Sequence, residues 1–331
     1  MQTADVAPIT GRRVIFVLEP FSFPSGGVAV IYQHAEILAE NGIPAYVALP
    51  RQPAEDFYGS RARLIIHHGK LPFRRGDIFV IPEGFPAYVK ALMATPVKRL
   101  MFCQNQYYLP FTNDPGSGFA EFGVHGLIAS SQTIGDFFRD VYGLTDIPLI
   151  PCAVDPAIYS VASRKRRQVA YMPRKLPAEA AFIQAVFRRR HQRYADIPWV
   201  AIDQKTQREA AAVLAESEVF LSLSHKESLG LPPLEAMACG CLVAGFHGDG
   251  GREYMTNENG WWAETGDWKA SVDGLAAALD LLQAGGDVLA FRRAAMAATV
   301  DRYSPARMRA ALLAFWRKEI ATPFSEDGSR T

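Results

Sequence analysis

Short apolar runs alternate with helix-patterned stretches along most of this 331-residue chain. RVIFVLEP (13–20) and DIFVIPE (77–83) are continuous apolar runs, which are typical of strands buried on both faces of a sheet. VAVIYQHAEILAENG (28–42) instead reads as a helix and ends in Asn-Gly, a good helix stop. This alternation predicts an open parallel sheet with helices packed against it.

A proline-rich segment, LTDIPLIPCAVDPAIY (144–159), interrupts the alternation, which then starts again. Because 331 residues exceed the usual size of a single core, we expect two α/β domains, residues 1–150 and 151–304, with 144–159 as the linker. Residues 305–331 then form a C-terminal helix and a tail. Ligands of parallel sheets bind beyond the carboxyl ends of the strands, so the loops at these ends are the candidate sites.

The charge balance argues against a polyanionic partner. Lys and Arg number 35, Asp and Glu number 34, and the formal net charge is +1. No nucleic-acid-binding motif is present, so we expect no nucleic acid partner. The arginines nevertheless cluster, as in RKRR (164–167) and RRRHQR (188–193). Such clusters form either solvated faces or a peripheral contact with an anionic membrane surface or a phosphorylated ligand.

The apolar runs are too short to cross a bilayer, and residues 1–10 lack the basic start and apolar stretch of a signal peptide. We therefore expect a cytoplasmic protein, with attachment to the cytoplasmic face of a membrane as the alternative that the arginine clusters leave open. Cys103, Cys152, Cys239 and Cys241 have no Cys-x-x-Cys or metal-ligand spacing. Free buried thiols and no metal site are the expectation.

Two glutamates flank the start of a predicted helix in SHKESLGLPPLEAMACG (224–240). Its two consecutive prolines fit only a first helical turn, so we expect the helix to begin near Leu231. Glu227 then lies in the loop before the helix and Glu235 about one turn inside it. The free N–H groups of a helix start favour an anion, and carboxylates accept hydrogen bonds from hydroxyls. These groups fit a nucleotide sugar; alternatively, one acid caps the helix and the other meets solvent.

The longer segment EVFLSLSHKESLGLPPLEAMACGCLVAGFHGDGGREYM (218–255) resembles the donor-site signature of the group-1, family 4-like retaining glycosyltransferases with the GT-B fold. The resemblance implies two Rossmann-like α/β domains that face a central cleft, an acceptor domain and a donor domain, with the last helix packed back on the first domain. The Glu-x7-Glu motif of that family falls on Glu227 and Glu235. By the resemblance, Glu227 contacts the donor sugar and Glu235 the ribose of the nucleotide.

The same resemblance points to cations that hold the diphosphate. The family has Gly-Arg and a later lysine after a strand, where this chain has Arg174 and Lys175 after QVAYMP (168–173). An arginine grips phosphate through two hydrogen bonds, and either Lys175 or Lys205 supplies the second charge. Arg174, Lys175 and Glu227 are thus the predicted catalytic residues.

The remaining implied contacts are backbone amides and polar side chains. Where many family members have a histidine facing the donor sugar, this chain has three amide side chains, Gln104, Asn105 and Gln106. Its glycine loop is one residue shorter than that of the family. The residues that we expect to bind substrate, beside Lys205 and Glu235, are Gly26, Gly27, Asn105, Gln106, Ser228, Leu229, Gly230, Leu231, Gly250 and Gly251.

The resemblance implies a reaction that moves a sugar from a nucleotide-diphosphate sugar to a hydroxyl acceptor with retention of configuration. The acceptor is a glycan, a lipid-linked molecule or a small molecule, and neither a metal nor another cofactor is expected. The alternative is a catalytically silent GT-B module that binds sugar nucleotide or scaffolds a partner enzyme. The sequence departs from the family pattern at 104–106 and 173–175, and this alternative therefore stays open.

Overall fold

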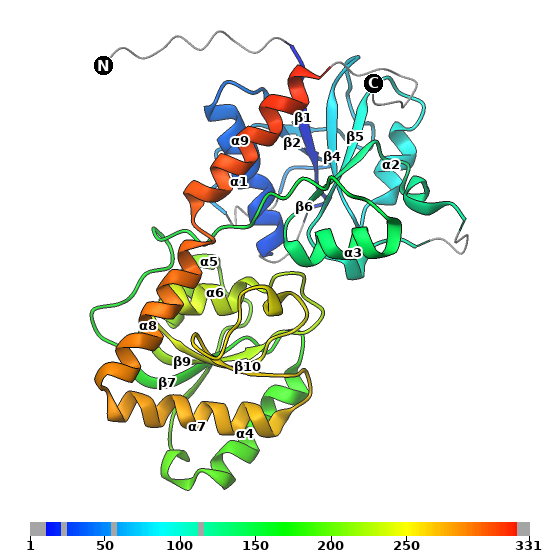
Figure 1. Ribbon diagram of the computed structural model, residues 1–331. Coiled ribbons are helices and arrows are strands. Elements are labelled where there is room, and N and C mark those ends of the chain that lie inside the picture. The colour runs from blue at the N-terminus through cyan, green and yellow to red at the C-terminus, as the bar shows by residue number, and fades with distance from the viewer. Residues whose placement is uncertain (1–10, 21–24, 54–57, 112–115, 323–331) are drawn as a thin grey trace. The chain divides into compact units, whose positions relative to one another are not determined.

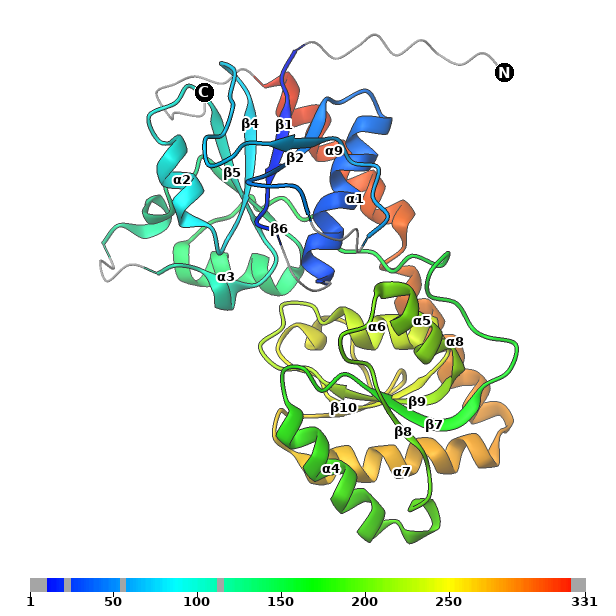
Figure 2. The same cartoon turned by 180° about the vertical axis from the view of Figure 1, so that it is seen from behind.

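The computed structural model of the chain describes residues 11–20, 25–53, 58–111 and 116–322. These residues divide into two compact units, which we call unit 1 (1–151 and 308–331) and unit 2 (152–307). Each unit contains one parallel β-sheet with helices on both faces (Figures 1 and 2). Among the described residues, no helix is long and apolar enough to cross a membrane.

Unit 1 contains a six-stranded sheet in the order β3-β2-β1-β4-β5-β6, and every adjacent pair is parallel. The order reverses between β1 and β4, which are neighbours in space. The strands are β1 Val14–Val17, β2 Ala45–Leu49, β3 Leu64–Ile66, β4 Ile78–Pro82, β5 Lys98–Cys103 and β6 Gly126–Ala129, and the helices are α1 Gly26–Glu40, α2 Pro86–Leu92, α3 Gln132–Tyr142 and α9 Pro305–Ala321.

The helices of unit 1 cover the two faces of its sheet in pairs. Ile15, Val17 and their neighbours pack against α2, and the corresponding residues of β5 and β6 pack against α3. On the opposite face Phe16 contacts His34 of α1 and Trp316 of α9, edge to face, at 6.3 Å and 6.2 Å between ring centroids. Trp316 is fully buried, so α9 belongs to the core of unit 1, beside α1 in both views (Figures 1 and 2).

Unit 2 contains a five-stranded parallel sheet in the order β11-β10-β9-β7-β8. Here the order reverses between β9 and β7. Helices α4 and α7 cover one face, and α5, α6 and α8 the other (Figure 1). The strands are β7 Arg166–Tyr171, β8 Trp199–Ala201, β9 Ser217–Leu223, β10 Leu242–Phe246 and β11 Trp261–Ala263, and the helices are α4 Pro177–Arg190, α5 Gln207–Glu216, α6 Leu231–Ala238, α7 Trp268–Ala284 and α8 Gly286–Asp301.

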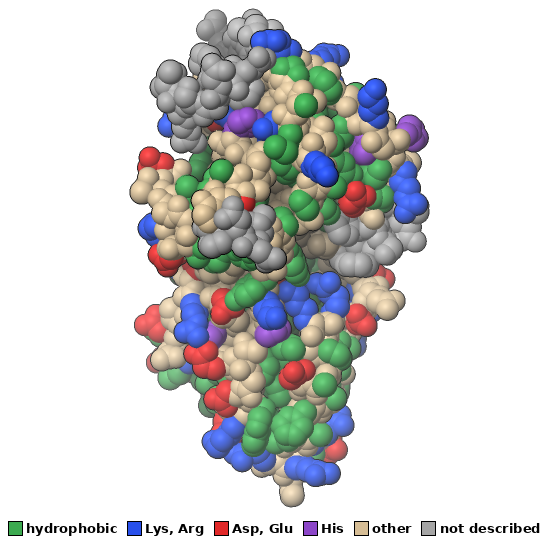
Figure 3. All heavy atoms as spheres, turned by 90° about the vertical axis from the view of Figure 1, so that its right-hand side faces the viewer, with side chains coloured by type: hydrophobic (Ala, Val, Ile, Leu, Met, Phe, Trp, Pro, Cys, Tyr) green, Lys and Arg blue, Asp and Glu red, His purple; other side chains and the backbone are tan. Residues whose placement is uncertain are grey.

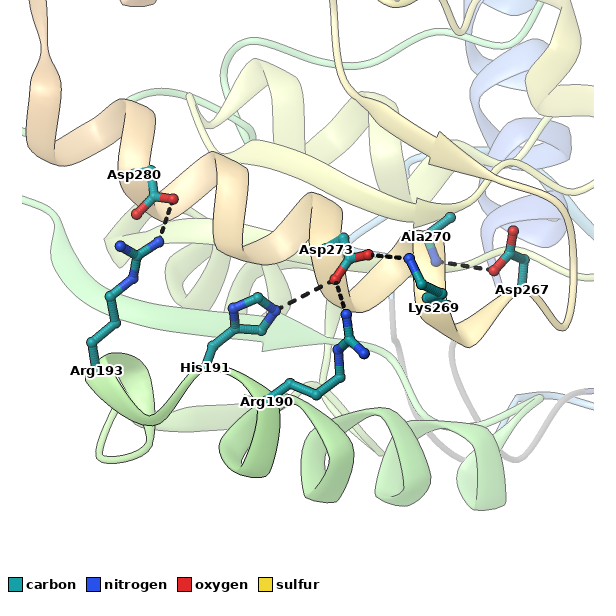
Figure 4. A network of polar contacts seen from close by, with 8 residues as sticks. All are labelled: Arg190, His191, Arg193, Asp267, Lys269, Ala270, Asp273 and Asp280. Carbon is teal, nitrogen blue, oxygen red and sulfur yellow. Dashed lines mark hydrogen bonds and ion pairs between the residues drawn. The ribbon is translucent and has the colours of Figure 1, made fainter.

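The arginine cluster at 188–193 joins two helices of unit 2. Arg190 contacts Asp273 of α7 at 3.0 Å, and His191 lies 3.6 Å from the same carboxylate. Arg193 pairs with Asp280 at 2.5 Å (Figure 4). On the face of the molecule in Figure 3, basic side chains are interspersed with acidic ones. Part of the cluster therefore serves the packing of α4 on α7, in line with the solvated-face alternative.

Three details differ from the sequence-based expectations. The strand β3 was not predicted, because it has three residues and its first one is exposed. Gly26 and Gly27 begin α1 and are not part of a glycine loop. The predicted linker, described throughout, contains no helix or strand but is attached to both units, since Ile150 donates its N–H to Ala129 O beside β6 at 2.9 Å and Tyr159 is buried in unit 2. All four cysteines are free and buried, as expected. The tail 323–331 lies outside the described residues.

Candidate functional site

The carboxyl edge of the unit 2 sheet collects the predicted residues of that unit. Loops that follow β7 and β9 leave toward opposite faces, because α4 and α6 lie on opposite sides of the sheet. Adjacent strands of this kind open a crevice at their carboxyl ends, where ligands of α/β sheets bind. Across it Lys175 Nζ lies 2.7 Å from Glu227 Oε1, and both side chains keep about a quarter of their surface exposed, 23% and 27%. The fold thus brings together two of the three predicted catalytic residues.

Helix α6 begins at Leu231, as expected from its two consecutive prolines. Gly230 is the residue before the helix and has φ 80°, a left-handed conformation that favours glycine. Its carbonyl accepts a hydrogen bond from the Tyr254 hydroxyl at 2.6 Å. Ser228 and Leu229 are buried just before it. The chain therefore enters α6 in a fixed conformation, and the partial positive charge of the helix start is held beside Glu227.

The glycine loop packs directly against the Glu227 loop. Gly250 donates its N–H to Glu227 O at 2.8 Å, and a Cβ added at Gly250 would lie 2.0 Å from the carbonyl carbon of Ser228. Gly251 leaves equally little room, with Met255 Sδ at 2.5 Å from an added Cβ. Only glycine permits this approach. The N–H of Gly250 is thus bonded within the protein, where it positions the Glu227 loop.

Glu235 lies on α6, partly buried beside the hydroxyl of Tyr159. Burial raises the pKa of Glu235 to about 7, and the hydrogen bond from Tyr159 opposes that shift. Near neutral pH this carboxyl group therefore exchanges between its charged and protonated forms. Tyr159 belongs to the segment interpreted as a linker, and no sequence pattern connected it with Glu235.

The other cations take different positions. Arg174 is exposed in the turn after β7, next to Lys175. Lys205 follows β8, the edge strand, which β7 separates from β9. Lys175 and not Lys205 is thus the lysine in contact with Glu227. Arg252 of the glycine loop pairs with Glu264 at 2.7 Å.

In unit 1 the predicted residues also lie at the carboxyl edge of the sheet. Gln104 donates from Nε2 to the carbonyl of Gly27 at 3.1 Å, which joins the end of β5 to the start of α1. Asn105 and Gln106 are buried, and Asn105 Oδ1 accepts the Tyr107 N–H at 3.1 Å. The two amides therefore shape the turn after β5.

Sequence reasoning missed an acid in this region. Glu83, directly after β4, is buried and accepts the N–H groups of Gln104 at 3.2 Å and Asn105 at 2.8 Å. Burial raises its pKa to about 7, against the pull of these hydrogen bonds. An acid directly after an apolar strand, as in the run DIFVIPE, was the available signal.

Comparison with known proteins agrees with this arrangement. Residues 201–283, which include both glutamates of the motif, match the family model described as glycosyl transferases group 1. An alpha-1,6-glucosyltransferase of Actinobacillus pleuropneumoniae serotype 7 (strain AP76) is 26% identical over 265 residues, which cover 77% of this chain and 80% of that protein. By these two matches the chain is similar to the group 1 glycosyltransferases.

Solved structures of glycosyltransferases share the fold of this chain. A glycosyltransferase from Rickettsia africae ESF-5 superposes with a TM-score of 0.71 at 15% identity, over 94% of this chain and 99% of its own. Anabaena HepE in complex with UDP-glucose superposes with a TM-score of 0.66 at 12% identity, over 93% and 100% of the two chains. The two parallel-sheet units thus have the GT-B fold of these structures.

Proposed function

We propose that this glycosyltransferase transfers glucose from UDP-glucose to a hydroxyl acceptor, with retention of configuration and without a metal ion. The contact between Lys175 and Glu227, 2.7 Å apart beside the start of α6, carries the proposal. In this proposal Lys175 is the cation that binds the diphosphate, and Glu227 beside it accepts hydrogen bonds from the sugar hydroxyls. The choice of donor is supported by the glucosyltransferase name of the relative and by the UDP-glucose bound to HepE.

The charge that develops on the departing diphosphate is the main barrier in such a transfer. Lys175, the neighbouring Arg174 and the amides at the start of α6 would stabilise that charge without rearrangement, since the backbone at 228–231 is already fixed. Glu227 would hold the glucose hydroxyls. Glu235, with its pKa of about 7, would bond the ribose hydroxyls in either protonation state.

The proposed step balances without a protein base. The bond between C1 of glucose and the phosphate oxygen breaks, and the acceptor oxygen bonds C1 from the same side. The proton of the acceptor hydroxyl passes to the departing phosphate oxygen. Cationic and amide groups neutralise the phosphate in this scheme, so a metal ion has no required role.

The test is transfer from UDP-glucose to methyl α-D-glucopyranoside, measured as UDP release, with NMR analysis of the new linkage. We expect an α-glucoside, a rate unchanged by EDTA, and a loss of about 100-fold or more for Glu227→Gln. A β-linked product would contradict retention, and inhibition by EDTA would contradict metal independence. The absence of UDP release from any nucleotide sugar with any acceptor would favour the catalytically silent module.

A further inference from the structure

We propose that donor binding is coupled to the two segments through which the chain passes between the units, with Tyr159 and Tyr303 as the positioning residues. Unit 2 is one continuous stretch of chain, so the chain passes between the units twice. We call residues 152–159 the first crossing and residues 302–304, between α8 and α9, the second crossing. The inference rests on the proposed nucleotide-sugar donor and adds residues that act on its site from a distance.

Each crossing contributes a buried tyrosine that is bonded to an element of the donor site. Tyr159 and Tyr303 are 5% and 3% exposed. The Tyr159 hydroxyl donates to the carboxyl group of Glu235 on α6. The Tyr303 hydroxyl donates to Oε1 of Glu253, the last residue of the glycine loop, at 3.1 Å. A buried hydroxyl that loses its partner is unfavourable, so each bond ties the position of a crossing to that of a donor-site element.

The second crossing is also connected to the start of α6. Arg302 donates from Nη2 to Glu253 O at 3.3 Å. The Tyr303 ring packs edge to face against Tyr254, with ring centroids 5.6 Å apart. Tyr254 is 1% exposed and donates its hydroxyl to Gly230 O at 2.6 Å, directly before α6. Continuous contacts therefore lead from the second crossing to the amides that would face the diphosphate.

The two crossings are bonded to each other as well. Val154 is buried and donates its N–H to Tyr303 O at 2.9 Å. Helix α8, which ends at the second crossing, packs against α6 (Figures 1 and 2). Close-packed interiors transmit displacements, and a network of buried hydrogen bonds is rigid when every member is satisfied. A shift of either crossing must therefore move the donor-site elements or break a buried bond.

The coupling has a consequence in each direction. A nucleotide that fixes Glu235, the glycine loop and the start of α6 would restrict the two tyrosines and, through them, the local opening of the crossings. By thermodynamic linkage, crossings held in place raise the affinity for the nucleotide by the same factor. Slower hydrogen exchange in the crossings on nucleotide binding is the observable that this linkage predicts.

Unit 2 offers a matched control away from α6. Tyr194, directly after α4, is buried, and its hydroxyl donates to the carboxylate of Asp280 on α7. Helices α4 and α7 cover the face of the sheet opposite α6. Tyr194→Phe therefore removes a buried hydroxyl–carboxylate bond from the same unit, as Tyr303→Phe does, but leaves the crossings intact.

The experiment uses the full chain and UDP. Calorimetry reads UDP affinity, UDP release from UDP-glucose reads KM and kcat, and hydrogen-exchange mass spectrometry compares residues 152–160 with residues 186–194 at saturating UDP. In wild type we expect UDP to slow exchange in 152–160 more than in 186–194. Tyr303→Phe and Tyr159→Phe should weaken UDP binding about three- to tenfold, raise KM more than they lower kcat, and abolish the extra protection of 152–160. Tyr194→Phe should bind UDP and protect 152–160 as wild type does.

Three results would each overturn the coupling: wild-type UDP affinity in Tyr303→Phe, an equal loss of affinity in Tyr194→Phe, or equal protection of the two segments in wild type. If UDP-glucose turns over in these cases, the proposed function stands alone. If GDP or ADP binds in place of UDP and protects 152–160 through the two tyrosines, the coupling stands and the proposed donor fails. Binding of none of the three diphosphates would overturn both.

Discussion

Replacement of Lys175 by methionine separates a catalytic role of this lysine from a structural one. Methionine keeps most of the length and the apolar stem but removes the charge that lies 2.7 Å from Glu227 Oε1. The two side chains are 23% and 27% exposed, and ion pairs with such access to water contribute about 1 kcal/mol or less to stability. For a domain of this size, that corresponds to about 2–4 °C in unfolding temperature.

The expected effect on catalysis is far larger. A preorganised group that stabilises charge in the transition state contributes about 2.7–4 kcal/mol, or 100- to 1000-fold in kcat. We therefore expect Lys175→Met to lose at least 100-fold in the rate of UDP release while its thermal unfolding stays within a few degrees of wild type. The loss in the rate of UDP release should be at least tenfold smaller for Lys205→Met, because Lys205 follows the edge strand β8.

Lys269→Met provides the control for this comparison. Lys269 pairs with Asp273 on α7 at 2.8 Å, so the substitution breaks a lysine–carboxylate pair of the same unit outside the candidate site. Its activity should equal that of wild type. A Lys175→Met protein with a rate within threefold of wild type would refute the assignment, and one that unfolds 10 °C lower would show that Lys175 acts mainly through stability.

Three further predictions concern stability and pH. The pKa of Glu235 in the folded protein is raised to about 7 from 4.5. Its contribution to stability is therefore fully present below about pH 4.5 and is lost as the pH rises through 7. In Glu235→Gln, the unfolding temperature should depend less on pH across this range. Gly250→Ala should destabilise unit 2 by about 1–3 kcal/mol and reduce the thermal shift produced by UDP, because its Cβ would lie 2.0 Å from Ser228 C; an unchanged shift would contradict the packing argument. Trp316→Ala should cost about 3–5 kcal/mol in urea unfolding, since Trp316 is fully buried, whereas Ala at the exposed Arg317 should change stability by less than about 0.5 kcal/mol.

The fold was predictable where local pattern and burial coincide. Strands buried on both faces, such as β1 and β4, are continuous apolar runs, and paired prolines can occupy only the first turn of α6. The strand β3 escaped prediction because an edge strand of three residues needs no apolar run. Its formation depends on pairing with β2, a long-range interaction.

In the candidate site, too, some residues were predictable from the sequence and others were not. Glu227 and Glu235 were found because they lie on one continuous stretch of chain with a proline-marked helix start. The contact of Lys175 with Glu227 depends on the order of β7 and β9. Tyr159 and Glu83 were missed because their significance depends on partners that only the folded sheet brings near. Local sequence thus identifies the acids, and topology determines which groups they meet.

The two sheets carry different charges at equivalent points of their topology. Each sheet reverses its strand order once, between β1 and β4 in unit 1 and between β7 and β9 in unit 2. The residues next to these points differ in charge: Glu19 and Glu83 in unit 1, against Arg174 and Lys175 with Glu227 in unit 2. A diphosphate is stabilised by cations and helix-start amides but would be repelled by a carboxylate such as that of Glu19. Glu83, with a pKa of about 7, is only partly charged at neutral pH. The charges beside each reversal point, and not the shared topology, therefore determine how strongly an anionic ligand is attracted to that edge.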